Sequence, residues 1–346
     1  MARKGLAVRT IPIMGLLAMG VLAVVAAACE NGEKGAEPTA APSLTAAAVT
    51  ATGTVTPGPT FVPATPVGTV EARVPSGKIA FASRRDGNGE IYLLTAESEV
   101  NLTNNPAEDE NPDISPDGSK IAFSSSREGT PHIYVMNVDG SGLVKLTDEP
   151  LGDMSPRWSP DGKRMAFSRT GAMMVMDSDG SNVQQVTEPK PEATAPLCEA
   201  GGFLGGWSPD GQRLTFYAAS ATRGLGQVCT VKVDGSELTV VASEPPAYHV
   251  EPSWSSDGQW IVYRFIQPDG NHEIYKIRPD GTSSTDLTNN PAMDIEPDWS
   301  PDGQWIVFSS FRFDNDFDLY IMRPDGSGVA RVTNTLGKDS DPSWGP

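Results

Sequence analysis

Acidic residues recur at two fixed positions in front of a repeated Pro-x-Trp motif, and these positions are the best placed in the sequence to do chemistry. Three residues before the proline stand Asp109, Asp153, His249, Asp294 and Asp339. Directly before the proline stand Asn111, Ser155, Glu251, Glu296 and Asp341. Carboxylates gathered in rings create a negative potential that attracts cations, metal ions or basic protein surfaces. If both rows face one opening, they form a candidate binding site with an acidic mouth.

A structural role competes with binding for the first row. Aspartate favours turns, where its carboxylate accepts backbone N–H bonds in the loop that enters a strand. A residue that is needed for such a turn is expected in every repeat, and this aspartate is present in nearly every repeat. His249 breaks the repetition, and a histidine exposed at the mouth would titrate near neutral pH. The role of each single aspartate stays open, and the ring as a whole is the candidate site.

No catalytic constellation is recognisable. The nucleophile elbow Gly-x-Ser-x-Gly of serine hydrolases is missing, and His132, His249 and His272 are too scattered for a histidine-rich metal centre. The run Asp314, Asp316 and Asp318 starts like a calcium loop, but Leu319 and Asp325 stand where an EF-hand needs Gly and Glu. We therefore predict no enzyme and no cofactor, and we leave open whether a metal ion sits in the ring.

Repeated units must position these residues. The turn Ser-Pro-Asp-Gly, or its variant Ser-Ser-Asp-Gly, ends at Gly118, Gly162, Gly211, Gly258 and Gly303, which lie 44, 49, 47 and 45 residues apart. A period in the middle forties is the length of a propeller blade. In each unit the Pro-x-Trp strand is followed by two more strands, an Asp-Gly hairpin turn and a fourth strand. This pattern predicts an all-β fold.

The two ends of the patterned region are complementary halves of one unit. Pro75–Ser83 is a strand with no Pro-x-Trp strand before it, and Asp339–Pro346 is a Pro-x-Trp strand with no turn after it. Joined, they complete six units. We expect a six-bladed β-propeller of four-stranded antiparallel blades, in which the C-terminal strand closes the first blade in a velcro fashion. The Pro-x-Trp strands would then be innermost and line a channel.

The stretch Ser115–Thr147, "SPDGSKIAFSSSREGTPHIYVMNVDGSGLVKLT", resembles the WD40-like repeats of the TolB propeller family, also called PD40 repeats. The resemblance extends from about Ser76 to the end and implies a propeller that binds protein at a channel face. Similar propellers occur in the dipeptidyl-peptidase and prolyl-oligopeptidase families, whose α/β-hydrolase domain this sequence lacks. TolB carries a separate domain before its propeller, where this sequence has a Thr/Pro-rich segment.

The first 29 residues have the pattern of an export signal. Arg3, Lys4 and Arg9 precede an apolar run that ends in small residues before Cys29. This resembles a bacterial lipoprotein signal with Cys29 as the lipidated residue, although Ala26 stands where Leu is usual, and an uncleaved anchor helix is the alternative. Residues 30–75 are rich in Thr, Ala and Pro and predict a disordered tether. The propeller is expected over residues 76–346.

Two further features of the sequence limit its possible functions and location. The formal net charge of −18 argues against nucleic acid as a partner, because phosphate binding needs clustered Lys and Arg. Cys198 and Cys229 are the only cysteines besides Cys29, and an exported location permits a disulfide between them. Such a bond would link the longest loop between blades covalently to the third strand of the next blade.

The sequence therefore predicts a non-catalytic, monomeric propeller lipoprotein of the cell envelope, facing the periplasm or the cell exterior. Its expected partner is a protein or peptide, bound through the acidic mouth, with a lipid anchor on the membrane. The alternative is a propeller that binds or hydrolyses polysaccharide or cell wall at the same mouth.

Overall fold

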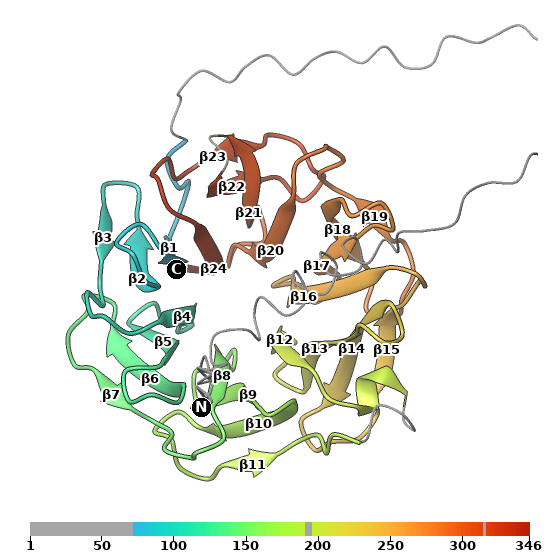
Figure 1. The fold of residues 1–346 in the computed structure, drawn as a ribbon, viewed down its shortest axis with the longest axis horizontal. Helices are drawn as coiled ribbons and strands as arrows, with labels where there is room; N and C mark the ends of the chain where they lie inside the picture. Colours follow the sequence, from blue (N-terminus) through green and yellow to red (C-terminus); the bar gives the residue numbers. More distant parts are fainter. Residues whose placement is uncertain (1–71, 191–195, 314–315) are drawn as a thin grey trace, which may run out of the picture. The chain divides into compact units, whose positions relative to one another are not determined.

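The computed structural model describes residues 72–190, 196–313 and 316–346, and it contains six antiparallel sheets arranged in a ring (Figure 1). The chain divides into two units, Met1–Val70 and Glu71–Pro346, and all six sheets belong to the second. The expected signal, Cys29 and nearly all of the expected tether lie outside the described residues. Within the described ranges, no helix is long and apolar enough to cross a membrane.

Every sheet is one blade of four strands, as predicted. Blade 1 consists of β24 (Asp339–Gly345), β1 (Lys78–Ser83), β2 (Glu90–Leu94) and β3 (Glu99–Asn101). Blade 2 consists of β4 (Asp109–Ile114), β5 (Lys120–Ser125), β6 (His132–Asn137) and β7 (Val144–Lys145). Blade 3 consists of β8 (Asp153–Trp158), β9 (Arg164–Arg169), β10 (Ala172–Asp177) and β11 (Gln184–Gln185). Blade 4 consists of β12 (Phe203–Trp207), β13 (Arg213–Ser220), β14 (Leu225–Lys232) and β15 (Thr239–Ala242). Blade 5 consists of β16 (Tyr248–Trp254), β17 (Ile261–Ile266), β18 (His272–Ile277) and β19 (Thr285–Asp286). Blade 6 consists of β20 (Asp294–Trp299), β21 (Ile306–Phe313), β22 (Asp316–Met322) and β23 (Ala330–Arg331).

The predicted closure of the ring is confirmed. Strand β24 pairs antiparallel with β1, so that Trp344 lies opposite Ile79 and Asp339 opposite Ser83. The indole Nε1 of Trp344 also donates a hydrogen bond of 2.9 Å to the backbone oxygen of Ser76. Figure 1 shows the first and last strands of the propeller side by side in one blade. The ring therefore closes without a free edge on its innermost strands.

The core lies between neighbouring blades. One apolar cluster joins Phe81 and Trp344 of blade 1 to Val307 and Leu319 of blade 6, and the other clusters are built alike. Near the ends of the innermost strands, Trp158, Trp207, Trp299 and Trp344 are buried in these clusters, and the partly buried Trp254 packs against another. Ile114 takes the same place in blade 2. Their burial fits the packing role that the sequence suggests for them.

The aspartates of the Ser-Pro-Asp-Gly turns are local turn residues. Oδ1 of Asp117 accepts a hydrogen bond of 2.6 Å from Ser115 Oγ and one of 3.0 Å from the N–H of Ser119. Gly118 supplies the positive φ that the turn requires. These bonds lower the pKa of the Asp117 carboxyl to about 2. The other four turns repeat this geometry.

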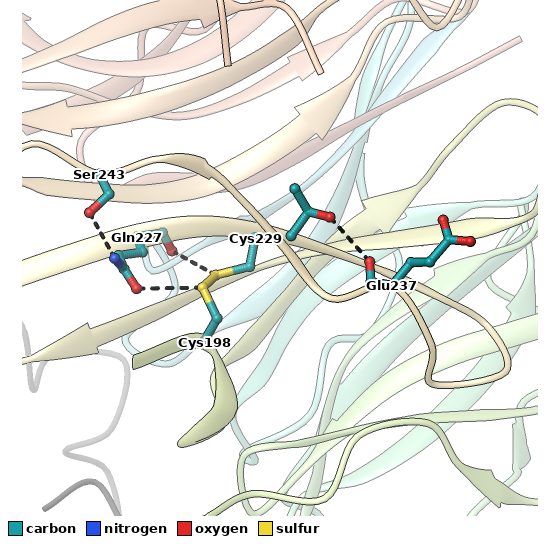
Figure 2. Close-up of a disulfide and its surroundings, with 6 residues drawn as sticks. Cys198, Gln227, Cys229, Glu237 and Ser243 are labelled. Carbon is teal, nitrogen blue, oxygen red and sulfur yellow. Dashed lines mark hydrogen bonds between the residues drawn. A yellow bond between two sulfur atoms is a disulfide. The ribbon is translucent and has the colours of Figure 1, made fainter. Parts of the chain in front are cut away.

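A disulfide holds the loop between blades 3 and 4 (Figure 2). Cys198 lies in the short 3-10 helix η1 (Leu197–Glu199), and its partner Cys229 lies on β14, with their Cα atoms 6.2 Å apart. The side chain of Gln227 lies beside the sulfur atoms and donates a hydrogen bond of 2.7 Å to Ser243 Oγ. The bond thus joins the loop to the third strand of the following blade.

Candidate functional site

The two acidic rows predicted from the sequence do not face the same surroundings. We call the residues three before the proline the aspartate row: Asp109, Asp153, Asp294 and Asp339, with His249 in blade 5. We call the residues directly before the proline the bulge row: Asn111, Ser155, Glu251, Glu296 and Asp341. Every member of the aspartate row is buried, with the four carboxylates at 0% exposure. The bulge row is partly exposed in all five blades.

Each carboxylate of the aspartate row is paired with an arginine of its own blade. The pairs are Asp109 with Arg127, Asp153 with Arg169, Asp294 with Arg312 and Asp339 with Arg85, at 3.1, 2.6, 2.8 and 2.9 Å. A buried carboxylate needs such a partner, because desolvation of an isolated charge costs several kcal/mol. The structure therefore places these aspartates inside the blades as compensated charges, and they do not present an acidic mouth.

Aromatic rings of the same blades pack against the guanidinium groups of these arginines. The guanidinium carbon of Arg85 lies 4.3 Å from the ring centre of Tyr92, and that of Arg127 lies 4.6 Å from the ring of Tyr134. These are cation–π distances. The sequence reasoning missed these arginines, although a signal exists: Arg85, Arg127 and Arg312 all stand four residues after the phenylalanine of the second strand.

His249 is not an exposed group that titrates near neutral pH. It is 2% exposed, and burial lowers the pKa of its imidazole to about 4. Its Nε2 accepts a hydrogen bond of 3.1 Å from the N–H of Glu244, so the ring is held neutral. His249 instead belongs to an aromatic group with Tyr263 and Phe265, whose ring centres lie 5.4 and 4.8 Å away.

Blade 4 contributes to neither row: Leu204 stands at the bulge position, and the backbone is too crowded for a side chain at the aspartate position. Gly202 stands at the aspartate position, and a Cβ there would lie 2.1 Å from the backbone oxygen of Tyr217. Gly205 stands at the proline position, where a Cβ would lie 2.2 Å from the backbone oxygen of Pro252. Only glycine fits such close approaches, which accounts for the glycine-rich form of this repeat.

A β-bulge gives the bulge row its direction. In β4 the register moves from Glu110 opposite Ser124 to Asp113 opposite Ala122, so two residues face one, and the other innermost strands have shifts at the same place. The five bulge-row residues all have a φ between 51° and 55°, in the left-handed region that residues other than glycine rarely adopt. The same local geometry is therefore imposed in five blades.

The bulge turns backbone N–H groups toward the neighbouring blade. The N–H of Glu296 donates to Oε2 of Glu251 at 3.0 Å, and the N–H of Asp341 donates to Oε2 of Glu296 at 2.8 Å. The side-chain amide of Asn111 donates to Asp341 Oδ1 at 3.1 Å. The acidic side chains thus form a continuous hydrogen-bonded series across four blades, numbered 5, 6, 1 and 2.

Two cations complete this group, which we call the axial cluster: Glu251, Glu296, Asp341, Arg264 and Lys338. Arg264 Nη2 lies 3.1 Å from Glu251 Oε1, and Lys338 Nζ lies 3.7 Å from Glu296 Oε1. The side chains of Glu251, Glu296 and Lys338 are 22%, 15% and 39% exposed, so solvent reaches them. The cluster is a mixed array of charges with an acidic excess.

Burial and the proximity of the carboxylates to one another raise the pKa of two of these acids. Burial, then repulsion by Glu296, raises the pKa of Asp341 to about 7, against the attraction of Lys338. Burial also raises the pKa of Glu251 although Arg264 opposes it, and the carboxylate of Glu296 raises the pKa of Lys338. The net charge of the axial cluster therefore changes around neutral pH.

A second tier lies two residues further along each innermost strand, at the middle residue of Pro-x-Trp. Asp113 Oδ2 accepts a bond of 2.6 Å from the N–H of Trp158, and Asp298 Oδ2 accepts one of 2.9 Å from the N–H of Trp344. Burial raises the pKa of Asp113 to about 7, and the positive charge of Arg157 acts against this shift. These bonds cross blade boundaries, so the tier also ties the ring together.

The described residues contain no group of three or more His, Cys, Asp or Glu side chains arranged to hold a metal ion. In the acidic run tested as a calcium loop, Asp316 accepts the N–H of Gly337 at 2.6 Å and Asp318 pairs with Arg331 at 2.5 Å; Asp314 lies outside the described residues. His132, His249 and His272 lie on three different strands and are buried.

Comparison with known proteins identifies a matching family and solved structures with a similar fold. The sequence matches the PD40 family, described as the TolB beta propeller domain, over residues 71–196 and 169–346. No curated protein matches it. TolB from Acinetobacter baumannii is 21% identical with a TM-score of 0.65, over 78% of this chain and 67% of that one. A chain of the nidogen/laminin complex is 11% identical with a TM-score of 0.59, over 78% and 98%. An oligogalacturonate lyase in complex with manganese is 18% identical with a TM-score of 0.50, over 75% and 74%.

Proposed function

The chain belongs to the TolB beta propeller family, and from this premise we propose that it is a non-catalytic propeller of the cell envelope that binds a protein or peptide through the axial cluster. The observation that carries the proposal is the convergence of Glu251, Glu296, Asp341, Arg264 and Lys338 from blades 5 and 6 and from the strand that closes blade 1 with the residue before it. Their exposed edges present both signs of charge in a fixed arrangement.

Fixed charges of this kind suit a folded partner. The backbone bonds hold the carboxylates before any ligand arrives, so binding does not have to order them. Complementary charge gives orientation and a faster encounter more than raw affinity. A partner with basic residues next to an acidic one would match the acidic excess and the ammonium group of Lys338.

The cellular setting belongs to the same proposal. The pattern of residues 1–29 supports export and a lipid anchor at Cys29, and residues 30–75 would serve as a tether between anchor and propeller. We propose that the propeller works as a monomer on the periplasmic or outer side of a membrane. The net charge of −18 argues against nucleic acid as a partner.

One observation favours the alternative of a polysaccharide-processing propeller. Burial raises the pKa of Asp113 to about 7 and also raises the pKa of Asp298 in the same tier, and glycosidases use a pair of carboxyl groups of which the general acid has a raised pKa. In each of these carboxylates, however, one oxygen accepts a hydrogen bond from a tryptophan backbone N–H and the other accepts one from a serine hydroxyl. This arrangement supports a structural role for the tier and makes protein binding the better proposal.

Site-specific cross-linking in the source organism tests the proposal. A photoreactive phenylalanine is placed at Lys338 in the axial cluster or at Val144 on the outer strand β7, where the side chain is 54% exposed. A discrete protein adduct from position 338 but not from position 144 is expected. Adducts from position 144 alone would move binding to the rim, and retention of cell-wall polysaccharide without any protein adduct would favour the alternative.

A further inference from the structure

Blade 5 contains a cavity that is separate from the axial cluster. It has a volume of about 260 Å³, and its lining includes Tyr263, Phe265 and Tyr275 together with His249, Glu244 and Ser284. Pockets for whole small-molecule ligands usually span about 300–1,000 Å³. This cavity, which we call the aromatic pocket, therefore has room for one large side chain or a ligand fragment.

Blade 5 differs from the other blades at two positions that line this pocket. Ser284 stands four residues after the aspartate of the Asp-Gly turn, where blades 2, 3, 4 and 6 carry Leu143, Val183, Leu238 and Val329. Tyr263 stands where the other five blades carry phenylalanine. Its hydroxyl lies 3.1 Å from Ser284 Oγ. A small polar residue has thus replaced a branched apolar one, and hydroxyl groups line the space.

The same ring pair holds a cation in other blades. Tyr263 and Tyr275, with ring centres 6.0 Å apart, correspond to Phe81 and Tyr92 in blade 1, which lie 5.7 Å apart. Over the blade 1 pair lies the guanidinium of Arg85, and blades 2 and 6 repeat the arrangement with Arg127 and Arg312.

Blade 5 lacks the arginine. Gln267 occupies its position, and the Phe265 ring packs on Tyr275 with centres 4.9 Å apart. In the part of the chain that the structure describes, no Arg or Lys lies over the rings of Tyr263, Phe265 or Tyr275 at cation–π distance. Blade 4 also carries no such arginine, with Ser220 at that position, but only blade 5 combines the absence of this arginine with the Tyr263 and Tyr275 ring pair that lines the aromatic pocket.

The charge around the pocket is negative. Glu244 is exposed beside the ring pair, and Asp286 lies close to the Tyr275 hydroxyl. Burial raises the pKa of Tyr275 to about 12, and the carboxylates of Asp286, Glu273 and Glu244 add to that shift. The buried imidazole of His249 is neutral, so it does not offset these charges.

We propose that the aromatic pocket receives the side chain of an arginine from a partner protein or peptide, in place of the arginine that blades 1, 2 and 6 supply internally. The rings would hold the guanidinium by cation–π contact, and Glu244 would pair with it at the rim. This inference goes beyond the proposed function, because the pocket lies in blade 5 and does not use the axial cluster.

Titration of the purified full chain with N-acetyl-argininamide, followed by saturation-transfer NMR, tests the inference. The neutral analogue N-acetyl-citrullinamide is the matched probe, because it has nearly the same shape and no charge. We expect millimolar binding of the arginine probe and at least fivefold weaker binding of the citrulline probe. Equal binding of the two probes would overturn the proposal.

Two variants of the pocket, each read beside a control, locate the binding. Ser284→Leu restores the residue type of the other blades and is expected to abolish the signal, whereas Val329→Leu at the same position of blade 6 leaves it unchanged. Glu244→Gln, an exposed change that spares the fold, is expected to weaken binding at least threefold. Unchanged binding in both Ser284→Leu and Glu244→Gln would refute the site. Glu296→Gln should leave the probe bound, so failure of the axial site and failure of this pocket are distinguishable.

Discussion

The backbone N–H of Asp341 donates a hydrogen bond of 2.8 Å to Oε2 of Glu296, 45 residues earlier in the chain. The bond joins the strand that closes blade 1 to the adjacent blade 6. Glu296 also accepts a bond of 3.1 Å from Ser309 Oγ and lies 3.7 Å from Lys338 Nζ. One carboxylate therefore links ring closure to the surface that we propose for binding.

Substitution of Glu296 should separate its charge from its role as an acceptor. Glu296→Ala leaves the Asp341 N–H and the Ser309 hydroxyl without a partner, so we expect a loss of about 1–3 kcal/mol in the free energy of unfolding. Glu296→Gln keeps an acceptor oxygen and is expected to lose less than half as much. Urea unfolding of both variants measures this difference, and equal stability of Glu296→Ala and the wild type would contradict it.

The raised pKa of Asp341 predicts a pH-dependent stability. Its pKa is about 7 in the folded protein against an ordinary value of 3.8, so the folded protein keeps a proton that the unfolded chain releases between these values. The stability contributed by this group is present below about pH 4 and is lost as pH rises through about 7. Asp341→Asn should remove this dependence, and Asn111 already occupies the same left-handed position in blade 2.

Urea unfolding at pH 5 and pH 8 checks this expectation. Over that interval the wild type should lose about 1–2 kcal/mol more than Asp341→Asn. Asp113 also has a pKa of about 7 and is present in both proteins, so its contribution cancels in the comparison. An identical loss in the two proteins would show that Asp341 is already ionised at pH 5.

The aspartate row should behave as a set of compensated buried charges. Arg127→Met leaves the carboxylate of Asp109 buried without its cation, and we expect it to lose about 3 kcal/mol of stability. The double variant Asp109→Asn with Arg127→Met should recover at least half of that loss. Chemical denaturation of the single and double variants measures the coupling, and strictly additive losses would argue against a buried ion pair.

Reduction of the disulfide should lower stability through the unfolded state. The bond between Cys198 and Cys229 spans 31 residues, which corresponds to about 4 kcal/mol in the chain-entropy treatment. Adding dithiothreitol is expected to lower the melting temperature of the wild type. A protein with serine at both positions should melt at that lower temperature with or without reductant. Melting of the wild type that does not respond to complete reduction would rule out a stabilising bond.

The repeat spacing was sufficient to predict the fold. Turn glycines 44 to 49 residues apart and the two half-repeats at the ends predict six blades and their closure, and both are confirmed. These features are local or periodic, so the strands and turns expected in one repeat can be checked against the sequences of the other repeats. The family resemblance rested on the same residues and is confirmed by the match over residues 71–346.

The candidate site was less predictable because it depends on a bulge. The innermost strands line the channel of a propeller, so Asp294 and Glu296 are expected together at one mouth. Residues two apart on a regular strand also point to the same face. The left-handed conformation at Glu296 places two residues opposite one and changes that alternation. As a result Asp294 points into the blade toward Arg312, and Glu296 joins the axial cluster. Hydrophobic periodicity carries no signal for such a change.

Ring closure also sets the order in which the propeller can be completed. During synthesis the strands β1, β2 and β3 are made first, but their blade lacks its innermost strand until β24 has been made. The bond between Ser76 and Trp344 joins residues 268 positions apart, which makes it one of the most entropically expensive contacts to form. Blade 1 is therefore the first to be started and the last to be finished, and the loss of β24 from the folded ring is the step by which its opening would begin.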